Sequence, residues 1–311
     1  EHFARRLANQ KYNIYITGSN AKMLSREIAT TLGGRFWNKD VYPYSFAEYL
    51  NARDIILSKN WMYGKQAAEV SKAFNDYFLY GGFPELTDVI AKRVWLNDIY
   101  SKIFFSDLIV RNKVRNEEAL GLLVRRLAEN VKQPVSYTRL ANLISSIGIK
   151  ISKATVIEFI RYLKESCLIF PIENYAAKFA ERNSNMKHYF IDNGLLSIFL
   201  LDGNTSLLEN IVAIHLYKRY GAQLYFYNQN IEVDFIIPEA KTAIQVSYSL
   251  MDETTCRREV EGLIKLNRVF PMDNMCIITR DEERIITHES GVSIHVIPVW
   301  KWLLEEEPLR T

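Results

Sequence analysis

Apolar side chains recur with helical spacing after Leu207, and one carboxylate interrupts their stripe. By the i, i+3, i+4, i+7 rule the face consists of Glu209, Val212, Ala213, Leu216 and Tyr220. Burying an unpaired carboxylate costs on the order of several kcal/mol. Glu209 is therefore predicted to have a partner, either a cationic side chain or a metal ion.

Two strands with period-two alternation are predicted after this helix. In the first, which follows a turn at 228–230, Asp234 projects away from the more apolar face. In the second, Gln245 and Ser247 share one face. We therefore expect these three side chains to converge with Glu209 on one pocket.

The order of these polar residues resembles the restriction-endonuclease-like superfamily, in which a helix Glu and a hairpin Asp precede Glu/Gln-x-Lys on the next strand. The resemblance implies a catalytic set and a divalent metal held by three of its members. The implied catalytic residues are Glu209, Asp234, Gln245 and Ser247, and the implied metal ligands are Glu209, Asp234 and Gln245. Carboxylate oxygens are suitable ligands for Mg²⁺ or Mn²⁺.

Ser247 stands where the superfamily has its lysine. A hydroxyl supplies neither a positive charge nor an easily exchanged proton near neutral pH. Lys241 has the right parity but lies roughly 20 Å away at about 3.3 Å per residue. On the presumed following helix, the cations that could replace the lysine are Arg257, Arg258 and Lys265.

Loss of a positioned acid-base group typically lowers a rate by about 10²–10⁴-fold. We therefore expect a weak divalent metal site without robust DNA cleavage. Three interpretations stay open at this point: retained nuclease activity, a fold kept for binding nucleic acid or a partner, and a purely structural polar cluster.

The N-terminal pattern is typical of a strand, loop and helix in a parallel sheet. An apolar-rich run over 12–17 ends in Gly18-Ser19-Asn20 and leads into a helical stretch over 21–32. Farther on, Ser45 and Glu48 are expected to form a capping box that opens another helix.

Several stretches carry a second resemblance, namely Ile16 to Asn20, Gly34-Arg35, Tyr42 to Tyr49, Tyr80 to Glu85, Tyr189 to Gly194, and the Glu209 to Ser247 block. They resemble a bacterial and archaeal AAA-type ATPase family, in which a P-loop domain is joined to a winged helix and a C-terminal nuclease-like domain of unknown function. The resemblance implies that Ser19 or Asn20 senses the γ-phosphate of the nucleotide. It also makes Arg35 a candidate for contacting phosphate from the same or a neighbouring subunit, so self-association through the ATPase domain is a further expectation.

The phosphate-binding motif of such ATPases is absent from this sequence. No G-x-x-x-x-G-K-[ST] occurs, and the pair Gly64-Lys65 is followed by Gln66. No apolar strand ends in the Asp-Glu pair that would hold Mg²⁺. The chain is therefore predicted to be a fragment of a longer ATPase, with ATP and Mg²⁺ as cofactors of the full-length parent and no tight ATP binding of its own.

A winged helix is predicted over 134–173, with helices at 137–145 and 153–166. The second helix would enter the major groove of DNA. The candidate DNA-binding cations are Lys150, Lys153, Arg161 and Lys164. Glu158 and Glu165 would repel a duplex, so DNA binding and packing against neighbouring elements both stay open.

The predicted fold class is α/β and multidomain. We expect a remnant of the AAA-type ATPase domain with its following helices over 1–90. A helical linker and winged helix follow over 91–175, and a restriction-endonuclease-like α/β domain over 176–311. The favoured function is an ATP-binding AAA-type ATPase acting on nucleic acid, with a degenerate nuclease-like domain. The alternatives are an active metal-dependent DNA nuclease and a protein-interaction or regulatory module without catalysis.

Composition agrees with this fold class but does not decide among the alternative functions. A hydrophobic fraction of 48% and a charged fraction of 24% are ordinary for a globular chain. The formal net charge of +3 permits nucleic-acid binding but does not argue for it. Three cysteines without metal-ligand spacing predict a reducing, cytoplasmic compartment. The apolar stretch over 195–201 is far shorter than the roughly 20 residues that span a bilayer, so no membrane partner is expected.

Overall fold

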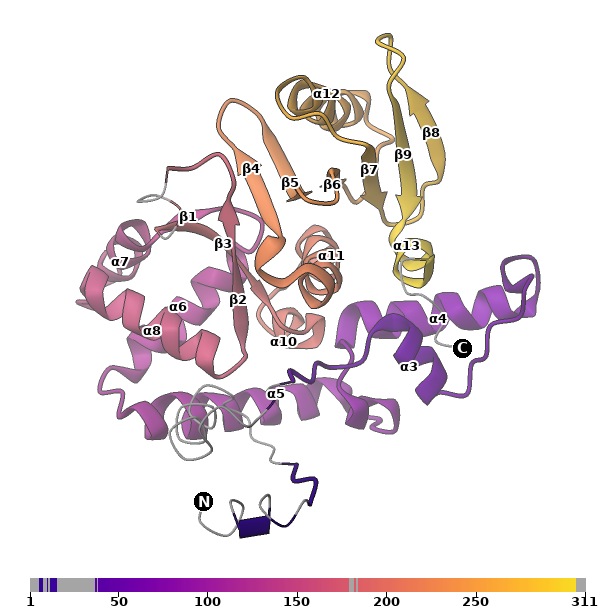
Figure 1. The fold of residues 1–311 in the computed structure, drawn as a ribbon. Coiled ribbons are helices and arrows are strands. Elements are labelled where there is room, and N and C mark those ends of the chain that lie inside the picture. Colours follow the sequence, from indigo (N-terminus) through magenta and orange to yellow (C-terminus); the bar gives the residue numbers. More distant parts are fainter. Residues whose placement is uncertain are drawn as a thin grey trace.

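The computed structural model describes residues 6–7, 10, 12–15, 37, 39–178, 182 and 184–305. These residues form a mixed α/β structure with a nine-stranded sheet of order β1-β3-β2-β4-β5-β6-β7-β9-β8 (Figure 1). The strands are β1 (Val135–Ser136), β2 (Ile169–Asn174), β3 (Asn185–Phe190), β4 (Tyr225–Asn228), β5 (Glu232–Ile237), β6 (Thr242–Val246), β7 (Asn274–Thr279), β8 (Arg284–Thr287) and β9 (Ser293–Pro298).

The helices precede, interrupt and follow these strands. They are α3 (Phe46–Ala52), α4 (Lys65–Tyr80), α5 (Lys92–Lys102), α6 (Glu117–Glu129), α7 (Tyr137–Ser145), α8 (Lys153–Glu165), α10 (Asn193–Ser197), α11 (Asn204–Tyr220), α12 (Glu253–Val269) and α13 (Val299–Glu305). Short 3₁₀ turns lie at Trp61–Tyr63, Pro84–Thr87 and Gly221–Gln223, and a π-helix at Ile103–Val110 continues α5.

The sheet is mixed because its strands are joined in two ways. Hairpin neighbours pair antiparallel, as in β2 with β3, β4 with β5, and β5 with β6. Parallel pairs join β2 to β4, β6 to β7, and β7 to β9. A helix intervenes between β2 and β4 and between β6 and β7, as parallel crossovers require.

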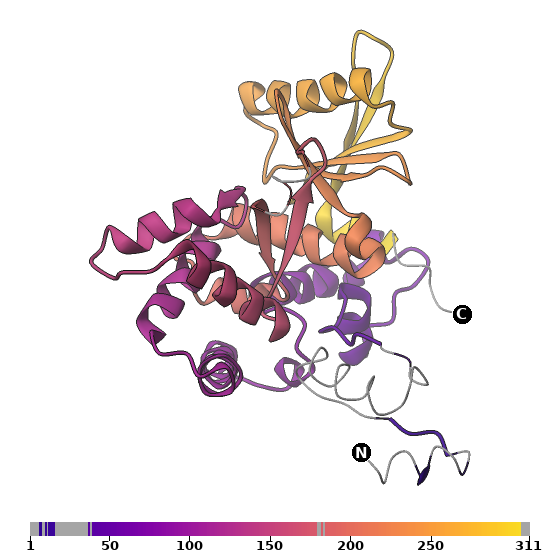
Figure 2. The same ribbon diagram turned by 60° about the vertical axis from the view of Figure 1, so that its left-hand side comes forward.

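Strand alternation distributes the apolar residues over both faces of the sheet. Phe235 and Ile244 pack in the larger core, which includes α11 and α13. Ile236 and Ala243, one residue along each strand, pack in a second core with α12. Helices α11 and α12 therefore cover opposite faces, and Figure 2 shows α12 at the top, separated from α11.

Several local predictions are confirmed. Ser45 accepts the backbone N–H of Glu48 at 3.3 Å, while the Glu48 side chain accepts the N–H of Ser45 at 2.9 Å, which is the expected capping box of α3. The predicted helices at 137–145 and 153–166 correspond to α7 and α8. Near the sheet, α6, α7 and α8 pack together against the β2–β3 end (Figure 1).

The predicted strand over 12–17 is wrong for the part that the structure describes. Residues 12–15 are in no strand, because none of the described strands pairs with them. A strand is stabilised by hydrogen bonds to a neighbour, so apolar and β-branched residues alone do not make one. Residues 16–36, with the predicted loop and helix, lie outside the described residues.

Candidate functional site

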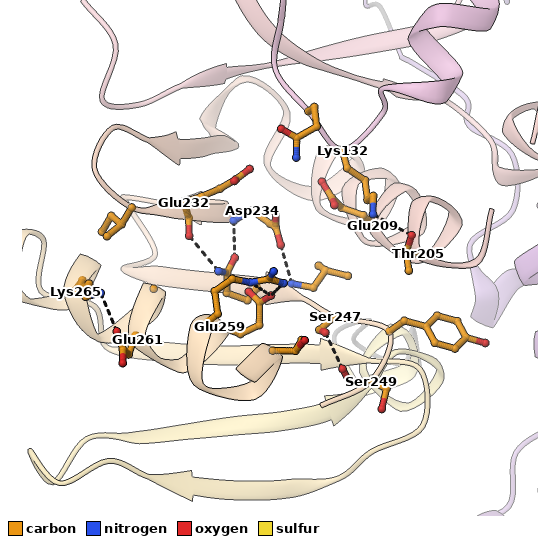
Figure 3. Close-up of a pocket in the computed structure, with 18 of the residues that line it drawn as sticks. Lys132, Thr205, Glu209, Glu232, Asp234, Ser247, Ser249, Glu259, Glu261 and Lys265 are labelled. Atoms are coloured by element: carbon orange, nitrogen blue, oxygen red, sulfur yellow. Dashed lines mark hydrogen bonds and ion pairs between the residues drawn. The ribbon is translucent and has the colours of Figure 1, made fainter. Parts of the chain in front are cut away.

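A groove of about 690 Å³ lies between α11, α12 and the strands β5 and β6 (Figure 3). The four residues expected to converge, Glu209, Asp234, Gln245 and Ser247, all line it. The strands β5 and β6 are adjacent and antiparallel, with Phe235 opposite Ile244. This register brings Asp234 beside Gln245, as the alternation predicts.

The partner of Glu209 is Lys187, which sequence reasoning did not identify. Lys187 lies on β3 and its side chain is 0% exposed. Its Nζ is 3.2 Å from Oε1 of Glu209 and 3.0 Å from Oδ1 of Asp234. Glu232 is more distant, at 3.6 Å. One ammonium group therefore bridges carboxylates from a helix and from the hairpin strand.

A signal for Lys187 is present in the sequence but is weak. Lys187 has the same parity as Tyr189 in a strand-forming run, so the two side chains share one face of that strand. A lysine at a buried strand position needs an anionic partner. Nothing in the local pattern says that the partner is on α11 or β5.

Electrostatic forces in the cluster oppose one another. Burial disfavours the charged forms of both Lys187 and Glu209. For Lys187 the carboxylates prevail, and attraction to Glu209 and then Asp234 holds its pKa above the ordinary lysine value. For Glu209 desolvation prevails and raises the pKa to about 7, although Lys187 lowers it.

Further hydrogen bonds fix the two carboxylates. Tyr189 donates its hydroxyl to Oε1 of Glu209 at 2.7 Å. The second oxygen of Asp234, Oδ2, accepts the backbone N–H of Val246 at 2.9 Å. The carboxylates are thus held in position by groups of the protein itself.

Gln245 and Ser247 are also engaged by neighbouring groups. The Gln245 side chain accepts the N–H of Asp234 at 2.8 Å and donates to the carbonyl of Glu232 at 3.1 Å. The side-chain carbonyl oxygen of Gln245, implied above as a metal ligand, therefore accepts a hydrogen bond from the backbone of β5. Ser247 donates its hydroxyl to the carbonyl of Ser249 at 3.0 Å.

Three of the cations considered as replacements for the missing lysine, namely Lys241, Arg258 and Lys265, have carboxylate partners. Arg258 lies 2.6 Å from Glu259, and Lys265 lies 2.8 Å from Glu261. Both pairs line the groove. Lys241 is 3.5 Å from Asp273, away from it.

The residues at the centre of the groove do not fit a divalent metal ion. The Lys187 ammonium lies between the two carboxylates that would be the ligands. In the part of the chain that the structure describes, no group of three or more His, Cys, Asp or Glu side chains could hold a metal ion. The arrangement is a buried charge cluster at the floor of an open polar groove.

Comparison with known proteins places the chain among its relatives. It is 32% identical over 318 residues to an uncharacterized protein of Methanocaldococcus jannaschii, covering 98% of this chain and 71% of that protein. It is 31% identical over 302 residues to an uncharacterized protein of Haemophilus influenzae, covering 94% of this chain and 71% of that protein. The chain belongs to the family of these two proteins. No solved structure matches it.

Two family models match parts of the chain. The AAA domain model matches residues 1–50, which relates the N-terminal segment to AAA-type ATPases as the resemblance implied. A domain of unknown function, DUF8612, matches residues 71–206. The restriction-endonuclease-like resemblance stays a prediction.

Two further sets of residues are predicted as binding sites. The nucleotide-binding candidates Ser19, Asn20 and Arg35 lie outside the described residues. The DNA-binding candidates Lys150, Lys153, Arg161 and Lys164 are all exposed. Arg161 lies 3.7 Å from Glu158, so part of its charge is balanced on the same helix. No helix in the described ranges is long and apolar enough to cross a membrane.

Proposed function

We propose that this protein is part of an AAA-type ATPase whose C-terminal groove binds its target without cleaving it. The observation that carries the proposal is Lys187, whose ammonium group lies between Glu209 and Asp234. The AAA domain match supports the ATPase relation. The order of Glu209, Asp234 and Gln245 supports a nuclease-like origin of the groove.

Hydrolysis of a phosphodiester in such a site depends on a divalent ion that activates water and neutralises charge on the phosphate. A lysine ammonium supplies one positive charge and three donors, but no open coordination position. Moving Lys187 aside would leave the buried Glu209 and the partly buried Asp234 without their cation, which is strongly unfavourable. In this proposal Lys187 takes the place of the weak metal site expected from the sequence.

The middle of the chain favours a nucleic acid as the target. We propose that α6, α7, α8 and the β1, β2 and β3 strands are a winged helix, because their order and pairing match that motif. The hairpin of β2 and β3 packs against other parts of its own chain, since β2 pairs with β4 and Tyr175 packs against Phe270. Binding would therefore rest on the exposed cations of α8 and the turn before it.

Metal titration and a cleavage assay test the first part of the proposal. We expect no heat of Mn²⁺ binding at submillimolar concentration and no Mn²⁺-dependent cleavage of single-stranded or duplex DNA. Mn²⁺-dependent cleavage that disappears in Asp234→Ala would overturn it. Glu261→Ala, which alters the groove wall and leaves the cluster intact, is the matched control.

Salt dependence tests the nucleic-acid part. Each phosphate contact contributes about 0.9 to the slope of log affinity against log salt. Lys153→Ala should weaken binding to duplexes of any sequence and lower that slope by about one. Lys102→Ala, which removes an exposed lysine elsewhere, should leave both unchanged. An unchanged slope in Lys153→Ala would exclude α8 as the binding face.

A further inference from the structure

Three sequence motifs that carry no role in the groove meet at one place in the structure. They are the Gly81-Gly82 turn after α4, the Asp192-Asn193-Gly194 segment after β3, and Asn210 beside Glu209 on α11. All three belong to the stretches that resemble the ATPase family. Their buried polar groups form one connected set of hydrogen bonds.

The first link joins the AAA-matching segment to the end of β3. Tyr44, within the matched residues 1–50, donates its N–H to the carbonyl of Gly82 at 2.7 Å. Gly82 in turn donates its N–H to Oδ2 of Asp192 at 2.7 Å. Oδ1 of Asp192 accepts the N–H of Gly194 at 2.8 Å, and the side chain is 3% exposed.

Glycine is required on both sides of this contact. A Cβ at Gly82 would lie 2.3 Å from the carbonyl oxygen of Tyr44. A Cβ at Gly81, which has a φ of 79°, would lie 1.9 Å from Oδ1 of Asp192. The two backbones and the carboxylate approach as closely as glycine allows.

The second link runs through two fully used amides. Asn193 donates to the carbonyls of Phe78 at 2.9 Å and Leu207 at 3.0 Å, so it ties α4 to α11. Its Oδ1 accepts from Asn210 at 2.9 Å. Asn210 also exchanges two hydrogen bonds with the backbone of Phe190, at 2.8 and 3.2 Å. Every donor of both amides is satisfied, which makes the network rigid and costly to break.

The third link reaches the groove. Asn210 follows Glu209 on α11, and Phe190 follows Tyr189 on β3, the tyrosine that donates to Glu209. Lys187 lies farther back on the same strand. The two elements that carry the Lys187–Glu209 ion pair therefore continue directly into the network.

A parallel contact comes from the far end of α11. Lys218 donates to the carbonyl of Pro43 at 2.6 Å and lies over the ring of Tyr42 at 5.7 Å. Lys218 and Asp192 line the same small cavity. Helix α11 thus contacts the AAA-matching segment at one end and the groove at the other, about 14 Å apart at 1.5 Å per residue.

We propose that this network couples the segment 42–45 to the groove, so that a change at either end alters the stability of the other. Asp192, Asn193 and Asn210 act as positioning residues that hold α4, β3 and α11 in one relative arrangement. The coupling is reciprocal, because an interaction free energy between two sites acts in both directions. The proposal rests on these contacts and does not require that the groove be nuclease-like.

Amide hydrogen exchange on the full chain tests the coupling. At the groove the reporters are the N–H groups of Asp234 and Val246, and at the other end those of Tyr44 and Gly82. Lys218→Met should speed exchange at Asp234 and Val246 about tenfold, the size expected for a lost hydrogen bond of a charged group. Tyr189→Phe, made at the groove, should speed exchange at Tyr44 and Gly82.

Lys301→Met is the matched control, because Lys301 also lies on a helix, is largely buried and pairs with Glu283 outside the network. It should leave all four reporters within about twofold of the wild-type rates. The amides of β9 report global opening and should stay within twofold in every variant. Changes confined to the mutated end, or equal to those in β9, would overturn the proposal. Failure of the metal test above would leave these rates as expected, so the two proposals fail separately.

Discussion

The Nζ of Lys187 lies 3.0 Å from Oδ1 of Asp234, although 47 positions separate the two residues in the chain. The contact spans β3 and β5, which are not neighbours in the sheet, because β2 and β4 lie between them. It places a fully buried cation beneath the floor of the groove, and we expect the stability of the protein to depend on it.

Lys187→Met should lower the free energy of unfolding by about 3–5 kcal/mol, because it leaves buried carboxylates without their cation. Adding Glu209→Gln to this variant should recover part of the loss, since it removes one of the stranded charges. Urea unfolding at pH 8 measures both. Lys265→Met, which breaks an exposed pair with Glu261, should cost less than about 1 kcal/mol. Equal losses in the two lysine variants would contradict the prediction.

Two tyrosine–glutamate hydrogen bonds offer a matched comparison of burial. Tyr189 donates to Glu209 inside the protein at 2.7 Å, and Tyr162 donates to Glu158 on the surface at 2.5 Å. Tyr189→Phe should cost about 1.5–3 kcal/mol, because the buried carboxylate loses a partner that water does not replace. Tyr162→Phe should cost less than about 0.5 kcal/mol. Chemical denaturation of both variants gives the comparison.

Acid should destabilise the fold through His188. Burial, aided by the charge of Lys164, lowers its pKa to about 4, and neither ring nitrogen has a hydrogen-bond partner among the described residues. The unfolded chain takes up its proton near pH 6.5. Stability is therefore fully present above that pH and is lost as the pH falls toward 4, by up to about 3 kcal/mol.

His188→Leu removes this titrating group and puts an apolar side chain in its place in the core. Its free energy of unfolding, measured against pH, should fall less steeply than that of the wild type between pH 6.5 and 4. Parallel curves for the two proteins would show that another group dominates the acid response. His215, whose pKa burial lowers to about 3, should add a second contribution of the same sign.

Gly82→Ala should cost more than about 2 kcal/mol, because the new methyl group would overlap the backbone carbonyl of Tyr44. Gly148→Ala is the control, since Gly148 has a φ of 94° with nothing within 4 Å of the added Cβ. It should cost only about 1–2 kcal/mol of backbone strain. Thermal melts of the two variants separate steric overlap from backbone strain, and similar losses would contradict the close approach at Gly82.

The sequence by itself determined the local features of this protein. The Ser45 and Glu48 capping box, the helices α7 and α8, and the adjacent strands of Asp234 and Gln245 all follow from spacing over a few residues. The requirement that Glu209 have a partner also follows, because a carboxylate in an apolar stripe cannot be buried alone.

Only the tertiary structure decided which groups meet. Periodicity tells which face of an element a residue occupies, but not which distant element packs there. Lys187 on β3 reaches Asp234 on β5 across the two intervening strands, and it reaches Glu209 because α11 packs against β3 and β6. The tertiary structure also decided that the side-chain amide of Gln245 hydrogen-bonds to the backbone of β5. It likewise brought the glycine, aspartate and asparagine motifs into one hydrogen-bond network. Such contacts between distant segments form only when the whole chain is folded, so local pattern alone does not specify them.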